Sequence, residues 1–367
     1  MKILKMAAAL PEKQFTTEKL MESFPCRLPE GLRQNILNLG VSKRYLLNHS
    51  NLNSMSEAKL IKLCEEACTA AVKKAGLSIA DINYFIAAYD ANPFLSPGLS
   101  QLLLPALRLD PYTGLVNLQG IASTAFPKTL EIAGGYLASH PEDNVLICVS
   151  GVSSYWFQNQ VRGLAEVMDI SEISSIADQA RRQRELQKWM ATIKAFLFGD
   201  GVASAVVANE GGGLHVVRTA EVTNIEKRDY LAGHARLVAA DGPFKFGFYT
   251  HLGKEIPELG AKYTTLVLKR LFGDDYENML RDVKKWAVHT GSVKILNALS
   301  ERHGIEAEKL QESYEVLREY GNLAGASLPF IVERIISKGK LSDGDLVLML
   351  GYGWGFSASA SLLRLEK

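Results

Sequence analysis

The pattern of apolar and polar positions changes repeatedly along the chain between a strand-like and a helix-like period. Short, almost wholly apolar runs are typical of strands covered on both faces, and apolar residues every three or four positions are typical of amphipathic helices. This alternation predicts an α/β fold. The predicted strands are residues 1–11, 82–89, 114–120, 144–149, 202–208, 214–222, 286–289, 346–350 and 357–363. The predicted helices are residues 57–75, 100–109, 124–138, 259–271, 293–303, 310–320 and 328–337.

These elements predict two similar α/β halves, residues 1–195 and 196–367, with a helical insertion at about 160–194. Residues 171–194 are polar and helix-favouring, and their centre reads Ala-Arg-Arg-Gln-Arg-Glu-Leu-Gln. This helix could present a basic patch to an acyl carrier protein or to the phosphates of coenzyme A. The pattern favours a solvated helical face instead.

Composition and charge exclude several classes of function. The chain has 367 residues, 47% of them hydrophobic and 22% charged, as in an ordinary globular protein. Lysine and arginine (41) nearly balance aspartate and glutamate (40), so no net positive charge favours nucleic acid or an anionic membrane. No apolar stretch is long enough for a membrane span, and the apolar start, interrupted by Lys5, predicts a strand rather than a signal peptide. We therefore expect a cytoplasmic protein.

The four cysteines do not have the spacing of a zinc site. Cys64 and Cys68 stand one helical turn apart, Cys148 lies in an apolar strand, and Cys26 is isolated. We expect reduced thiols in the core, no metal and no permanently bound cofactor. Glycine clusters at 211–213 and 351–355 lack the strand-to-helix context of a phosphate-binding loop.

The most informative segment runs from Asn117 to Ala133. It predicts a buried strand, a tight turn and a helix that begins just after Ser123. The unpaired N–H groups and the dipole at a helix N-terminus favour developing negative charge, so Ser123 is a candidate nucleophile. Serine is also a frequent N-cap, and this segment alone favours the cap.

The segment resembles the active-site turn of the thiolase superfamily, particularly ketoacyl synthase III and the chalcone-synthase-like type III polyketide synthases. That turn reads approximately Asn-Leu-Gly-Gly-Met-Gly-Cys-Ser-Ala-Gly. Aligning its downstream leucine and alanine with Leu130 and Ala133 places the family's nucleophilic cysteine on Ser123. A register shifted by two residues places it on Ile121 instead.

Other segments match the same family in the same order along the chain. They are Phe198–Gly201, His251–Pro257, Trp286–Gly291 with the position of the catalytic histidine at His289, Glu319–Ser327 with that of the catalytic asparagine at Asn322, and the glycine-rich Gly351–Gly355. The resemblance therefore covers nearly the whole chain. It implies a thiolase fold, in which two similar βαβαβαββ halves form five layers, αβαβα.

The resemblance also implies site residues and partners. Ser123, His289 and Asn322 would be catalytic, Phe198 and Thr250 would gate the acyl tunnel, and Gly353 would bind substrate in the glycine-rich loop. Thr250 is smaller than the phenylalanine usual at its position, which widens the expected entrance. The substrate would be acyl-CoA or an acylated acyl carrier protein. The assembly would be a homodimer or a heterodimer with a ketosynthase paralogue.

Serine at position 123 changes the expected chemistry. A cysteine thiolate is a strong nucleophile and a good leaving group, whereas a neutral hydroxyl needs a general base, here His289, and forms a less reactive oxygen ester. The sequence leads to an acyltransferase or condensing enzyme of polyketide or fatty-acid-like biosynthesis that carries its acyl group on Ser123. The alternative is a catalytically inactive partner of a cysteine-bearing paralogue. Acyl transfer to oxygen or nitrogen stays open beside carbon–carbon condensation.

Overall fold

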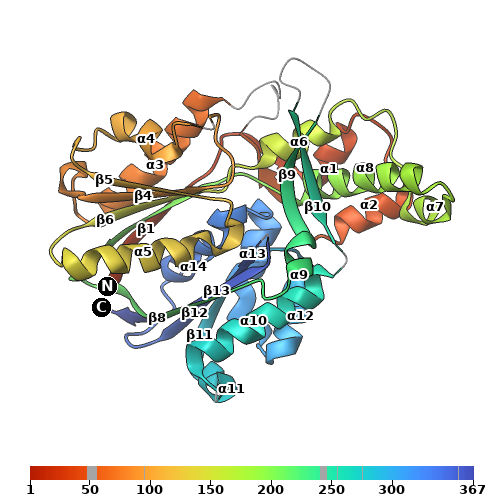
Figure 1. Ribbon diagram of the computed structural model, residues 1–367. Coiled ribbons are helices and arrows are strands. Elements are labelled where there is room, and N and C mark those ends of the chain that lie inside the picture. The colour runs from red at the N-terminus through yellow and green to blue at the C-terminus, as the bar shows by residue number, and fades with distance from the viewer. Residues whose placement is uncertain (48–55, 95, 240–245, 254, 275, 354) are drawn as a thin grey trace.

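A large mixed sheet forms the framework of the molecule (Figure 1). The computed structural model describes residues 1–47, 56–94, 96–239, 246–253, 255–274, 276–353 and 355–367. Among these residues nine strands pair in the order β11-β12-β13-β8-β1-β7-β6-β4-β5. They are β1 (Lys2–Ala9), β4 (Tyr84–Tyr89), β5 (Gly114–Gln119), β6 (Val145–Ser150), β7 (Val202–Ala208), β8 (Gly213–Thr223), β11 (Val283–Val288), β12 (Leu346–Gly353) and β13 (Ser357–Glu366).

The sheet consists of two parts that meet at β1 and β8. Strands β1 and β8 pair antiparallel only at Lys2 and Ile3 of β1. Over most of their lengths β1 pairs with β7, and β8 pairs with β13. In one part β4 runs parallel to β5 and β6, and in the other β11 runs parallel to β12. Parallel neighbours end at the same edge, so loops after their carboxyl ends can share a site.

Helices cover both parts of the sheet and fill the space between them (Figure 1). Helices α3 (Glu57–Lys74) and α4 (Leu99–Leu107) form one outer layer, and α10 (Ile256–Phe272) and α12 (Val293–His303) form the other. Helix α13 (Gln311–Tyr320) packs against α14 (Ser327–Ser337). Helices α5 (Ala125–Ser139) and α14 lie between the two parts of the sheet. This confirms the predicted five-layered thiolase fold.

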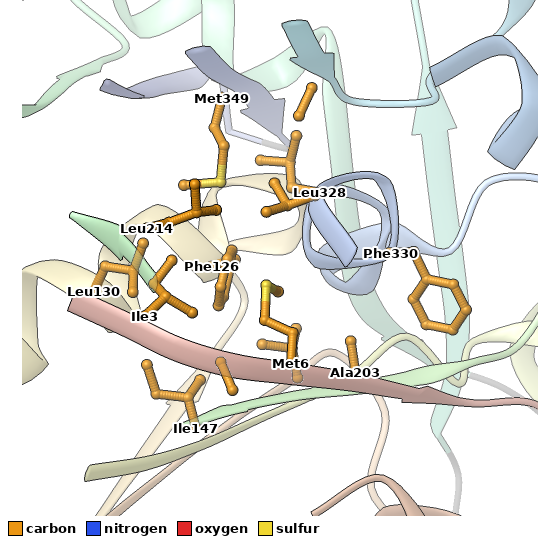
Figure 2. Close-up of a cluster of buried hydrophobic side chains, with 14 of the residues drawn as sticks. Ile3, Met6, Phe126, Leu130, Ile147, Ala203, Leu214, Leu328, Phe330 and Met349 are labelled. Atoms are coloured by element: carbon orange, nitrogen blue, oxygen red, sulfur yellow. The ribbon is translucent and has the colours of Figure 1, made fainter. Parts of the chain in front are cut away.

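The central layer holds the core that joins the two parts (Figure 2). Phe126 and Leu130 of α5 and Leu328 of α14 are fully buried against Ile3 and Met349 from the strands on either side. Burial of each such side chain stabilises the fold by about 1.5–3 kcal/mol. The apolar faces of α5 and α14 therefore fix the positions of the turns that precede them.

The remaining elements connect or flank the strands and helices of this framework. They are β2 (Gln14–Thr16), α1 (Thr17–Glu22), α2 (Glu30–Leu37), β3 (Lys43–Tyr45), α6 (Ser154–Val161), α7 (Ile170–Ser175), α8 (Gln179–Leu197), α9 (Lys227–Leu231), β9 (Gly233–Ala239), β10 (Phe246–Leu252) and α11 (Tyr276–Met279), with 3₁₀ turns η1 (Ile79–Asp81), η2 (Ala122–Thr124), η3 (Leu280–Asp282), η4 (Ala307–Leu310) and η5 (Ala324–Ala326). Strand β9 pairs with β10, and β2 with β3.

Two predictions about local structure need correction. The single helix expected at 171–194 is two helices, because Asp178 accepts a hydrogen bond from the Arg181 N–H at 2.6 Å and caps a new helix, α8. The glycine-rich segment 351–355 begins as strand, since β12 continues to Gly353. The division at residue 195 stays a prediction; β7, which lies beyond it, pairs with β1 and β6 of the first part.

The described residues also bear on the cysteines and on membranes. Cys64, Cys68 and Cys148 are buried free thiols, and Cys26 is a half-buried one. In the described part of the chain no helix has the length and apolar character needed to cross a bilayer, and no cluster of side chains there has the make-up of a metal site.

Candidate functional site

A strained turn between β5 and α5 carries Ser123. Gly120 (φ 79°) and Ala122 (φ 43°) both adopt left-handed backbone conformations, which are costly for alanine and cluster at functional sites. The N-cap of α5 is Thr124, whose hydroxyl donates to the Ile121 carbonyl at 2.7 Å. The interpretation of Ser123 as the helix cap is therefore wrong, and its hydroxyl is available for another partner.

That partner is His289. The Ser123 Oγ and His289 Nε2 atoms are 2.8 Å apart, and both side chains are only 4% exposed. His289 directly follows β11, and its N–H donates to the Leu350 carbonyl of β12 at 3.0 Å. The structure thus brings together the two residues that the sequence singled out, whereas the alternative position, Ile121, packs against the apolar core.

Burial keeps His289 neutral. Desolvation lowers its pKa to about 3, so the imidazole is uncharged at neutral pH. Its second nitrogen, Nδ1, is buried and has no hydrogen-bond partner among the described residues. The ring of Tyr352 meets the imidazole edge-on, with the ring centres 5.6 Å apart. Among the residues that the structure describes, the contact with Tyr352 and the hydrogen bond to Ser123 orient this histidine.

Two glycines of β12 let the strand approach the Ser123 turn. A Cβ atom on Gly351 would lie 2.5 Å from the Ser123 carbonyl oxygen, and one on Gly353 would lie 3.0 Å from that of Ile121. Both distances are shorter than ordinary van der Waals contact. Gly353, which was predicted to bind substrate, therefore lies at the site. Its lack of a side chain allows β12 to pack closely against the backbone of the Ser123 turn.

Asn322 occupies a second turn, which lies between α13 and α14. Its N–H donates to the Leu197 carbonyl at 2.9 Å, and its Oδ1 accepts from the Ala324 N–H at 2.8 Å, which leaves the amide NH₂ as the side chain's donor. The turn packs against that of Ser123, since a Cβ atom on Gly325 would lie 2.9 Å from the Ala122 carbonyl oxygen. Asn322 makes no direct hydrogen bond to Ser123 or His289.

Phe198 borders the Asn322 turn. The two residues form an isolated parallel bridge, and the Phe198 ring stacks on Phe157 with the centroids 4.2 Å apart. Lys194, one turn earlier on α8, is buried with its ammonium 5.9 Å from the Phe157 ring centre, and burial lowers the pKa of Lys194 to about 8. The backbone of Thr250 lies in β10, but its side chain is outside the described residues.

Two acids near these turns, the buried Asp200 and the half-buried Asp90, were not among the predicted site residues. Asp200, in the Phe-Gly-Asp-Gly motif, accepts from the N–H groups of Leu47, Ser153 and Ser154 at 2.8, 3.0 and 2.9 Å and from the Ser154 hydroxyl. Burial raises the pKa of Asp200 despite these bonds. Asp90 follows β4, and burial raises its pKa to about 6. An acidic residue directly after an apolar strand was the available signal for Asp90.

The geometry suits chemistry at a carbonyl carbon. Helices α5 and α14 both begin at the two packed turns, so the positive ends of their dipoles lie at the site and favour developing negative charge. A hydroxyl at hydrogen-bond distance from a neutral imidazole can lose its proton as it attacks. The arrangement can therefore form an ester on Ser123.

Comparisons with known proteins agree with this geometry. Residues 277–365, which include His289 and Asn322, match the 3-oxoacyl-(acyl-carrier-protein) synthase III C-terminal family. The chain is 26% identical to a 3,5-dihydroxyphenylacetyl-CoA synthase of Amycolatopsis balhimycina over 82% of this chain and 71% of the relative. It is 24% identical to the β-ketoacyl-(acyl-carrier-protein) synthase III of Staphylococcus haemolyticus, with 83% of each chain covered.

A solved structure gives the same fold. The 1,3,6,8-tetrahydroxynaphthalene synthase of Streptomyces coelicolor, a bacterial type III polyketide synthase, superposes with a TM-score of 0.80 over the whole of both chains, at 22% identity.

Proposed function

We propose that this chain, which belongs to the thiolase superfamily with ketoacyl synthase III and type III polyketide synthases as its relatives, is an acyltransferase or condensing enzyme of polyketide or fatty-acid-like biosynthesis. Its substrate is an acyl thioester of coenzyme A or of an acyl carrier protein. The observation that carries the proposal is the 2.8 Å contact between Ser123 Oγ and His289 Nε2 at the start of α5.

The proposed first step is acylation of Ser123. The Ser123 oxygen attacks the thioester carbonyl carbon, the new C–O bond forms, and the C–S bond breaks. The hydroxyl proton passes to His289 Nε2 and from there to the departing thiolate, which leaves as a thiol. The Asn322 NH₂ group and the N-termini of α5 and α14 stabilise the negative charge on the carbonyl oxygen.

The proposed second step hands the acyl group to an acceptor. An oxygen ester is a less reactive acyl donor than a thioester, so a reactive acceptor or a general base must compensate. Transfer to an oxygen or nitrogen nucleophile needs only deprotonation of that nucleophile. Condensation also needs a carbanion, as the malonyl-type extenders of such pathways provide.

Intact-protein mass spectrometry tests the acylation. The purified chain is incubated with a panel of acyl-CoAs and acylated carrier proteins, and the mass gain is mapped to a peptide. We expect one acyl adduct on the peptide that contains Ser123, absent in Ser123→Ala and retained in Ser139→Ala at the exposed far end of α5. Equal labelling of Ser123→Ala would disprove the nucleophile.

A non-catalytic partner subunit is the second candidate. It is favoured by His289 Nδ1, which has no partner in the described part of the chain, whereas a serine–histidine pair in other enzymes has an orienting acid there. This candidate predicts that a cysteine-bearing paralogue keeps full activity when paired with the Ser123→Ala, His289→Ala or Asn322→Ala variant. Loss of activity in any of these pairs would favour catalysis by this chain.

A further inference from the structure

A buried hydroxyl joins the two backbone segments that follow His289 and Asn322. Thr290 Oγ1 donates to Ser327 Oγ at 2.8 Å, and the Leu323 N–H donates to the same oxygen at 3.1 Å. Thr290 directly follows His289, and Leu323 directly follows Asn322. The three hydrogen-bonded residues are fully buried. One oxygen atom, that of Ser327, therefore links the turn that carries the histidine to the turn that carries the asparagine.

On the histidine side, Thr290 is the central residue of a tight turn. The His289 N–H donates to the Leu350 carbonyl of β12 at 3.0 Å. The Gly291 N–H donates to the His289 carbonyl at 2.9 Å and closes a three-residue turn around Thr290. These bonds tie His289 to the sheet, and the Thr290 hydroxyl adds a bond from the same turn to the start of α14.

On the asparagine side, the Ser327 hydroxyl closes the η5 turn. The Ala326 N–H donates to the Leu323 carbonyl at 3.0 Å, and the turn contains Ala324 in a left-handed conformation, at φ 47°. Such a conformation persists only where the surroundings hold it. Ser327 does not act as a helix cap here, because its oxygen accepts from an N–H four residues before it rather than from the first turn of α14.

We propose that Thr290 and Ser327 are positioning residues, whose hydroxyl bridge fixes the His289 imidazole relative to the Asn322 amide at the site of Ser123. The effect on activity rests on the proposed function, whereas the bridge itself rests on the two hydrogen bonds. The Ser327 oxygen has two lone pairs, and the two donors occupy both. Loss of the oxygen would leave two buried donors without a partner, which costs more than the loss of an exposed hydrogen bond.

Two substitutions of Thr290 separate the hydroxyl from packing. Thr290→Val keeps the size of the side chain without the hydroxyl, and Thr290→Ser keeps the hydroxyl without the methyl group. The assay is labelling of Ser123 by an alkyl fluorophosphonate, in which the serine oxygen bonds to phosphorus, fluoride leaves, and the hydroxyl proton passes to His289. We expect Thr290→Val to lower the labelling rate about tenfold, and Thr290→Ser to stay within about twofold of the wild type. Equal rates in the two variants, or a slower Thr290→Ser, overturn the proposal.

A double variant tests whether the two hydroxyls act as one unit. Ser327→Ala removes the oxygen that both hydrogen bonds share, so adding Thr290→Val to it should lower the labelling rate no further. Effects that multiply in the double variant overturn the proposal. The matched control is Ser204→Ala, which removes another buried hydroxyl, one that donates to the Ile147 carbonyl at 2.8 Å within the sheet. This control should keep the wild-type labelling rate.

Hydrogen exchange measures the bridge without any substrate. We expect Thr290→Val to accelerate amide exchange about tenfold in peptides covering residues 287–292 and 321–327, whereas Thr290→Ser and Ser204→Ala leave both peptides close to the wild-type rate. Unchanged exchange of either peptide in Thr290→Val overturns the proposal. If the wild-type chain is not labelled by the fluorophosphonate, the proposed nucleophile fails, and hydrogen exchange alone decides the bridge.

Discussion

Gly351→Ala should misplace Ser123 by steric contact alone. The added Cβ atom would lie 2.5 Å from the Ser123 carbonyl oxygen, about 0.9 Å short of ordinary contact at 3.4 Å, and 2.9 Å from a Leu328 methyl carbon. The carbonyl is backbone and cannot rotate away, so the Ser123 turn or β12 must shift by a large part of this shortfall. A shift of that size breaks the 2.8 Å contact with His289.

The expected cost has two parts. Overpacking of this kind lowers the free energy of unfolding by about 1–3 kcal/mol, and misplacement of a reacting group by about 1 Å lowers a rate about 100-fold. Urea denaturation measures the first quantity, and the rate of Ser123 labelling by a fluorophosphonate or an acyl-CoA measures the second. Gly353→Ala, with its nearest contact at 3.0 Å, should give a smaller loss of both.

Gly135→Ala is the matched control. Gly135 lies in α5, the helix that follows the Ser123 turn, and a Cβ atom there meets nothing within 4 Å. We expect this variant to keep the wild-type labelling rate and to gain about 0.5–1 kcal/mol of stability, because alanine is the better helix former. Wild-type labelling by Gly351→Ala would refute the link between β12 packing and Ser123.

Two further predictions concern stability. The pKa of His289 is lowered to about 3 in the folded chain, below the value near 6.5 expected when unfolded, so its contribution to stability is present above pH 6.5 and is lost as pH falls toward 3. Between pH 7 and 5 the free energy of unfolding of the wild-type chain should fall by about 2 kcal/mol because of His289. Urea titrations should show a fall in His289→Gln that is smaller by that amount. His303, whose pKa is lowered to about 4, contributes equally to both proteins. In urea denaturation, Phe126→Ala should lower the free energy of unfolding by about 3–5 kcal/mol, because the ring is fully buried in the central layer. A decrease of less than about 1 kcal/mol would contradict the placement of Phe126 in the core.

The elements with strong apolar periodicity could be predicted from the sequence. Helix α12 begins and ends at the predicted residues, Val293 and His303, because a serine caps its start and the left-handed Gly304 ends it. Residues 14–45 gave no such signal, since β2 and β3 have three residues each and the N-cap of α2 is Pro29, which has no capping side chain. Short elements of this kind are specified by packing rather than by local pattern.

The sequence predicted which residues form the site but not the contacts that hold them in place. The ordered motifs pointed to Ser123, His289 and Asn322, and the structure places the turns that carry them together. The contacts that hold those turns join residues far apart in the sequence, such as Asp200 with Leu47 and Gly351 with Ser123. No local pattern encodes a hydrogen bond across 153 residues or the absence of a Cβ atom against a distant carbonyl.

The electrostatics of the Ser123–His289 pair bear on which reaction it can serve. A cysteine at this position would work as a thiolate and would need a nearby positive charge, but here burial holds the imidazole neutral and the hydroxyl keeps its proton until attack. The pair therefore requires no buried charge before the reaction, and proton transfer must accompany bond formation. In the second step the same neutral imidazole can accept a proton from a hydroxyl or amine acceptor as that acceptor attacks the ester. On the proposed function, we expect this imidazole to assist an oxygen or nitrogen acceptor more directly than a carbanion, which needs a separate source such as decarboxylation.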